Sequence, residues 1–184
     1  AASDGYKRQA QEIISSNENM LQPSGGFPGT APESCMGVRP APELQRILKT
    51  CIPFLKQGVD PAVVFVASRN VPAPGPGASA YSVPKAGQTQ LARIAALELG
   101  QFGIRVNVLH PDCVYDTGLW TRETLERSAE RYGLTVEEYK SRNVLKSDVK
   151  SREVAKMVCA MAGSVFAKTT GAQIPIDGGS DRVI

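Results

Sequence analysis

The 184-residue chain contains few of the residues from which metal centres and disulfide frameworks are built. It has one histidine, His110, and four single cysteines, none of them in a CxxC pair: Cys35, Cys51, Cys113 and Cys159. Cysteines without metal-ligand spacing are typical of reduced thiols in a cytoplasmic protein. We therefore predict no metal site and a cytoplasmic location.

Long apolar runs and strong charge are also missing. No run approaches the length of a membrane span, and no charged-then-apolar leader opens the chain, so the sequence predicts neither a membrane protein nor export. The net charge is +3, and the basic residues are spread among acidic ones. This distribution gives no support to nucleic-acid binding, although it leaves room for an anionic ligand. The 42% hydrophobic and 21% charged residues are typical of one soluble globular domain.

Residues 1–42 differ in composition from the remainder. They run into "QPSGGFPGTAPESCMGVRPAP", which is dense in proline, glycine and serine. Such a composition predicts a loop or a disordered arm. We therefore assign one ordered domain to residues 43–184.

Hydrophobic spacing within residues 43–184 predicts alternating helices and strands. A polar segment, residues 119–145, predicts two short helices around Gly133, and Pro175 places the last strand at a sheet edge because proline cannot donate to the ladder. The predicted helices are 43–57, 81–99 ended by Gly100, and one N-capped by Ser151; the predicted strands are 62–68, 103–111 and 171–177. This order indicates an α/β fold with a parallel sheet and right-handed crossovers.

Three side chains form a candidate catalytic group. Tyr81 and Lys85 are four residues apart on a predicted helix, so they share one face. A nearby ammonium stabilises a phenolate and lowers its pKa, which would make the pair a tuned general acid and base. Ser68 ends an apolar strand, at the edge where parallel sheets bind ligands, and its hydroxyl can donate or accept. Taken alone, Tyr81 and Lys85 would be interpreted as a surface pair with no role, because most pairs at this spacing have none.

Four motifs occur in a fixed order: the strand-ending Ser68, Tyr-x-x-x-Lys at 81–85, "GIRVNVLHP" at 103–111, and a terminal "TGAQIPIDGG". Over residues 42–184 the chain thereby resembles the short-chain dehydrogenase/reductase family. "APGPG" at 73–77 and "TTGAQIP" at 169–175 resemble the dehydrogenase domain of bifunctional aldolase/short-chain dehydrogenases most closely.

The resemblance implies a Rossmann-like three-layer parallel sheet and hydride transfer between NAD or NADP and an alcohol or carbonyl substrate, for example a small sugar-derived one. Ser68 would polarise the substrate oxygen, Tyr81 would exchange its proton, and Lys85 would hold the nicotinamide ribose and lower the pKa of Tyr81. Pro111, Val114 and Thr117 would line the nicotinamide carboxamide, with an ordinary turn around Pro111 as the alternative. The sole histidine, His110, is expected to be structural.

The sequence also departs from the family. The N-terminal dinucleotide-binding βαβ units are missing, because Gly25, Gly26 and Gly29 lack the strand and helix that such a motif requires. The family's helix asparagine, expected near Arg39, is absent. These departures leave three hypotheses: an active oxidoreductase, a truncated non-catalytic homologue that acts as an interaction or oligomerisation module, and a fragment of a longer chain. Helices 43–57 and 81–99 correspond to the family's dimer interface, so we expect a homodimer or homotetramer.

Overall fold

The computed structural model describes residues 41–180 of the chain. The glycine cluster and nearly all of the predicted arm at 1–42 lie outside these residues. The helices are α2 (Ala41–Leu55), α3 (Ser79–Leu99), α4 (Arg122–Arg131), α5 (Val136–Lys140) and α6 (Ser151–Ala162), with short 3-10 turns η2 (Gly100–Phe102) and η3 (Ser164–Phe166); the strands are β1 (Ala62–Val66), β2 (Arg105–Pro111) and β3 (Gln173–Ile176).

The described strands form one parallel sheet in the order β1-β2-β3. In its register Phe65 pairs with Val108, and His110 pairs with Pro175. Pro175 therefore lies on a strand that pairs only with β2 within the described part, as its missing N–H predicts. The carboxyl ends of all three strands point towards the same edge of the sheet.

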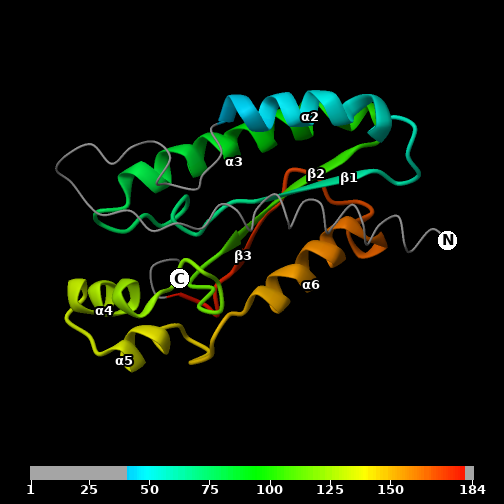
Figure 1. Ribbon diagram of the computed structural model, residues 1–184. Helices are drawn as coiled ribbons and strands as arrows, with labels where there is room; N and C mark the ends of the chain where they lie inside the picture. Colours follow the sequence, from blue (N-terminus) through cyan, green and yellow to red (C-terminus); the bar gives the residue numbers. More distant parts are fainter. Residues whose placement is uncertain (1–40, 181–184) are drawn as a thin grey trace.

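Helices cover both faces of this sheet, which makes a three-layer α/β fold (Figure 1). On one face α2 and α3 pack over β2. The contact surface of α3 has small side chains, Ala92, Ala95 and Ala96. The other face is covered by α6. The first core comprises Leu48, Leu55, Phe65, Ala67, Ala92, Ala95, Ala96, Leu99, Ile104, Val106 and Val108; the second comprises Val64, Leu109, Val158 and Met161. Their split follows the two-residue alternation of a strand buried on both faces.

The predicted end of helix 81–99 at Leu99 is confirmed, and two details of the predicted helix termini are corrected. Gly100 is right-handed and continues into η2, and the left-handed stop is Gly103, with a φ of 72°. Ser151 is the first helical residue of α6, because its backbone N–H and its hydroxyl both bond the Asp116 carboxylate while Lys150 occupies the cap position. The predicted pair of short helices around Gly133 is confirmed by α4 and α5.

The predicted strands are longer than the observed ones. β1 ends at Val66, yet hydrogen bonds to β2 continue past it, from Ala67 N to Leu109 O at 2.8 Å and from Arg69 N to Pro111 O at 3.0 Å. The segment that holds Ser68 therefore stays fixed to the sheet. Among residues 41–180, no helix combines the length and the apolar character that a bilayer crossing requires.

Candidate active site

Ser68 and Tyr81 meet at the carboxyl end of β1. Ser68 lies two residues beyond the strand and is buried, and its Oγ accepts a hydrogen bond from Asn70 N at 3.1 Å. Tyr81 lies in the first turn of α3, and the Ser68 side chain is close enough to lower the pKa of its hydroxyl. The sheet and the start of the helix thus bring together two hydroxyls that are distant in sequence.

Lys85 lies one turn further along α3 and points back into the same region. It is 5% exposed, its Nζ donates to Val66 O at 3.0 Å, and the same atom is 6.0 Å from the centroid of the Tyr81 ring. Burial lowers the pKa of Lys85 to about 8, because a buried ammonium loses its hydration. The structure therefore brings the three predicted catalytic residues together.

The expected effect of Lys85 on Tyr81 is not found. Burial raises the pKa of Tyr81, the hydrogen bond from Ser68 lowers it, and the negative charge of Asp112 raises it further. The net pKa is above the ordinary value, so the sequence-based expectation of a lowered pKa is wrong for the chain by itself. Desolvation of the phenolate prevails over the ammonium one turn away.

The predicted cofactor loop follows β2. Pro111 ends that strand and accepts the bond from Arg69 N. Thr117 closes a turn on Val114 O, through its backbone N at 3.3 Å and its Oγ1 at 2.8 Å, and Val114 forms a parallel bridge with Val149. Both residues thus have a structural role in this turn, and their contact with a cofactor stays a prediction.

His110 is held on both sides of its ring. Nδ1 lies 2.8 Å from Ser68 O and Nε2 lies 3.2 Å from Gln173 Oε1, and the residue is 2% exposed. These contacts fix the backbone of Ser68 to β2 and β3. They agree with the structural role expected for the only histidine.

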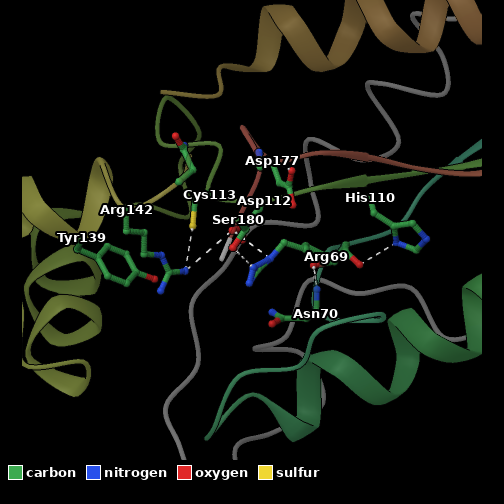
Figure 2. A network of polar contacts seen from close by, with 12 residues as sticks. Arg69, Asn70, His110, Asp112, Cys113, Tyr139, Arg142, Asp177 and Ser180 are labelled. Atoms are coloured by element: carbon green, nitrogen blue, oxygen red, sulfur yellow. Dashed lines mark hydrogen bonds and ion pairs between the residues drawn. The ribbon is translucent and has the colours of Figure 1, made fainter. Parts of the chain in front are cut away.

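A charged cluster beside the catalytic group was not predicted from the sequence. Arg69 Nε lies 3.2 Å from Asp112 Oδ2, and Arg142 Nη2 lies 3.9 Å from the same oxygen. Figure 2 shows the Arg69 side chain directed towards Asp112 and Ser180, which lie next to each other, and Arg142 approaching from the side of Tyr139. One signal could have found two of its members: Arg69 and Asp112 both directly follow the apolar part of neighbouring parallel strands, whose carboxyl ends meet.

Aromatic side chains of residues 115–145, which we call the lid segment, pack beside this cluster. Trp120 lies edge-on to Tyr115 at 5.0 Å between ring centroids. Arg142 stacks over Tyr139 at 4.4 Å and over Tyr132 at 5.0 Å. The lid segment is therefore joined to Asp112 through one guanidinium.

Comparison with known proteins identifies the family. A family model described as enoyl-(acyl carrier protein) reductase matches residues 43–181. The chain belongs to the short-chain dehydrogenase/reductase family. Its fold and the order of its motifs are those expected from the sequence.

Relatives of this short-chain dehydrogenase/reductase chain are oxidoreductases. It is 40% identical over 123 residues to the uncharacterized oxidoreductase YuxG of Bacillus subtilis, covering 64% of this chain and 18% of that protein. It is 32% identical over 125 residues to sorbitol-6-phosphate 2-dehydrogenase of Klebsiella pneumoniae, covering 65% of this chain and 47% of the relative.

A solved structure is similar as well. The NADPH-bound short chain oxidoreductase of Pseudomonas aeruginosa PAO1 has a TM-score of 0.63 at 29% identity, covering 73% of this chain and 51% of the other. The chain spans about half the length of most curated relatives it matches.

Proposed function

We propose that this chain carries the catalytic group of an NAD- or NADP-dependent oxidoreductase that transfers hydride between the cofactor and an alcohol or carbonyl substrate. Ser68, Tyr81 and Lys85 are the proposed catalytic residues. The observation that carries the proposal is the buried ammonium of Lys85, which donates to the backbone at the end of β1 at 3.0 Å and lies 6.0 Å from the centroid of the Tyr81 ring, close to Ser68.

The described residues fit the nicotinamide end of a dinucleotide. Lys85 has three N–H groups on its Nζ, and Val66 O accepts one of them, so further donors remain for ribose hydroxyls. Tyr81 would contact the ribose as well, and the loop with Pro111, Val114 and Thr117 would lie along the carboxamide. When bound, NAD or NADP supplies or accepts the hydride.

The residues of the chain would handle the substrate oxygen and its proton. In the reducing direction the Ser68 hydroxyl donates to the substrate carbonyl and polarises it, and Tyr81 gives its proton to the same oxygen as the alcohol forms. In the oxidising direction Tyr81 takes that proton back. An ordinary phenol already keeps its proton at neutral pH, so Tyr81 is available as the acid, and burial, which raises its pKa, disfavours the phenolate. Lys85 would favour the phenolate in the oxidising direction.

For the substrate we propose a small sugar-derived alcohol or carbonyl compound. Support comes from the similarity to sorbitol-6-phosphate 2-dehydrogenase, which by its name acts on a sugar alcohol phosphate. The match to YuxG covers 64% of this chain but 18% of that protein, so the relative is much longer. A longer relative is compatible with the proposed link to bifunctional aldolase/short-chain dehydrogenases.

We further propose a homodimer or homotetramer formed through the outer faces of α2 and α3. These faces expose apolar side chains, among them Phe54 at 73% and Leu97 at 84%, together with Ile47, Val83 and Ile94. Light scattering at micromolar concentration should give twice or four times the mass of one chain, and a strictly monomeric species would contradict this part of the proposal.

Scattered single cysteines and spread charge support a cytoplasmic protein without a nucleic-acid partner.

The substitution Tyr81→Phe tests the catalytic proposal. It removes the exchangeable proton and keeps the ring, so turnover should fall by roughly 100-fold or more. The assay follows NADH and NADPH absorbance with a panel of small sugar alcohols and hydroxyaldehydes. Fluorescence titration of both cofactors, made first, should show saturable binding in the wild-type chain and in the variant. No binding at millimolar cofactor would favour the non-catalytic interaction module.

A further inference from the structure

Arg69 takes no part in the proton transfer described above, yet it is the most deeply enclosed charged residue of the described chain, with an exposure of 0%. Resting on the proposed function, we propose that Arg69 is a positioning residue: it fixes the Ser68 end of β1 to the loop after β2 and neutralises Asp112 beside Tyr81. All of these partners belong to the chain itself, so the positioning role can be tested without measuring turnover.

Arg69 connects three segments that meet at the carboxyl edge of the sheet. Its backbone N donates to Pro111 O at 3.0 Å, and its own carbonyl accepts from Ala73 N at 3.0 Å. Its guanidinium pairs with Asp112 through Nε at 3.2 Å and donates from Nη1 to Ser180, which is 1% exposed. One side chain thus ties the end of β1, the loop after β2 and the segment after β3 together (Figure 2).

This anchoring acts on Ser68 because the two residues are adjacent. Val71 N donates to Ser68 O at 3.0 Å, so Ser68 begins a turn in which Arg69 is the next residue, and the guanidinium extends from this turn to Asp112. His110 holds the carbonyl of Ser68 from the adjacent strand. A guanidinium that cannot shift therefore limits the movement of the serine hydroxyl relative to Tyr81.

Asp112 is the group through which Arg69 reaches Tyr81 electrostatically. Its carboxylate faces Arg69 from the end of β1, Arg142 and Tyr139 from the lid segment, and the neighbouring thiol of Cys113. Ser68 and Asp112 both act on the pKa of Tyr81, and Lys85 Nζ lies 6.0 Å from the centroid of the Tyr81 ring. Because Asp112 disfavours the phenolate, the charge that Arg69 places against Asp112 assists proton exchange at Tyr81.

The test is a pH titration of Tyr81 in the cofactor-free 184-residue chain, by NMR with carbon-13-labelled tyrosine and the Tyr81→Phe variant for assignment. Asp112→Asn removes the negative charge and should lower the pKa of Tyr81. Arg69→Met should raise it, and Arg142→Met should raise it less, because Arg142 lies 3.9 Å from the carboxylate and Arg69 lies 3.2 Å from it. The double variant Arg69→Met/Asp112→Asn should titrate like Asp112→Asn alone.

Activity gives a second, separate readout. For alcohol oxidation, which needs the phenolate, the pH profile of kcat/KM should move to lower pH in Asp112→Asn and to higher pH in Arg142→Met, and Arg69→Lys should fall between wild type and Arg69→Met. Displacement of Ser68 in Arg69→Met should lower kcat by roughly 100-fold. A merely structural Arg69 would reduce the folded fraction without moving either profile.

The outcomes separate this inference from the proposed function. Tyr81 titrations that shift as described in a chain without turnover would support the positioning role and contradict the enzyme. Turnover with an unmoved Tyr81 titration in Asp112→Asn and Arg142→Met would overturn the role of Arg69. If Arg69→Met does not fold, the Asp112→Asn and Arg142→Met titrations still decide, because neither removes the fully buried guanidinium.

Discussion

The catalytic group and the charged cluster lie side by side at the carboxyl edge of the sheet, and they differ in how their polar atoms are satisfied. Lys85 Nζ carries three N–H groups and, among the described residues, donates one hydrogen bond, to Val66 O. Arg69, by contrast, has an anion, a hydroxyl and two backbone partners. A buried cation without a counter-ion is held at a cost in stability, whereas removal of one partner of a buried ion pair is itself destabilising. The first group is therefore suited to bind and react, and the second to hold it in place.

Replacement of Arg69 should give the largest loss of stability. Arg69→Met leaves Asp112 and Ser180 without their buried partner, so the free energy of unfolding should fall by roughly 3–5 kcal/mol. Urea unfolding followed by circular dichroism measures this difference. Arg152→Met on the exposed side of α6 is the control and should change it by less than about 0.5 kcal/mol. Equal effects of the two changes would mean that the cluster is not a structural anchor.

Replacement of Lys85 should raise the free energy of unfolding, whereas replacement of Arg69 lowers it. The pKa of Lys85 is lowered to about 8 from 10.5, so the ammonium is disfavoured in the folded chain. Lys85→Met should therefore stabilise the chain by about 2 kcal/mol at neutral pH, after allowance for the lost bond to Val66 O, while it abolishes turnover. Lys49→Met, at an exposed position of α2, should do neither.

The pH dependence of stability provides a check on the same residue. Between the folded pKa of about 8 and the unfolded value of 10.5, the unfolded chain binds more protons at Lys85, so wild-type stability should rise with pH across this window. Well below pH 8 Lys85 is charged in both the folded and the unfolded chain, so it does not make the stability depend on pH there. The rise should be absent from Lys85→Met, and a rise that persists in the variant would assign it to another group.

The two groups also differ in how far the sequence predicts them. Local patterns predicted the parallel α/β fold and placed Tyr81 and Lys85 on one helix face, with Ser68 at a strand end. Their catalytic role came from the family resemblance and stays a prediction. Arg69, Asp112 and Arg142 come from three distant segments, and each by itself looks like a surface charge. Only the tertiary packing of strand ends against the lid segment reveals that they are one cluster.

The direction of the Tyr81 pKa was mispredicted for a related reason. The sequence shows that an ammonium is near, and it cannot show how much water is excluded from the phenol or that Asp112 lies close. The N-cap of α6 was misplaced by one residue likewise, because Asp116 binds Ser151 across 35 residues of chain. Interactions that are local in space but not in sequence account for both differences.

Ser68→Ala should separate reactivity from stability within the catalytic group. It removes the hydroxyl that binds Asn70 N and Tyr81, so the free energy of unfolding should fall by about 1 kcal/mol, while kcat falls by roughly 100-fold. Ser164→Ala, exposed in η3, is the matched control for both measurements. A loss of stability as large as that of Arg69→Met would contradict the distinction between the two groups.

Thr117→Val should give the smallest effect, and it decides to which group the cofactor loop belongs. The change removes the bond from Oγ1 to Val114 O, at 2.8 Å, and should lower the free energy of unfolding by about 0.5–1 kcal/mol. Thr50→Val removes an equivalent bond, to Arg46 O at 3.0 Å on α2, and serves as the control. If Thr117 contacts the cofactor as proposed, the Kd for NADH or NADPH should rise by about 3–10-fold in Thr117→Val alone. An unchanged Kd with the same loss of stability would make the segment an ordinary turn. The loop would then support the site, as Arg69 does, and the Thr117 side chain would not bind the cofactor.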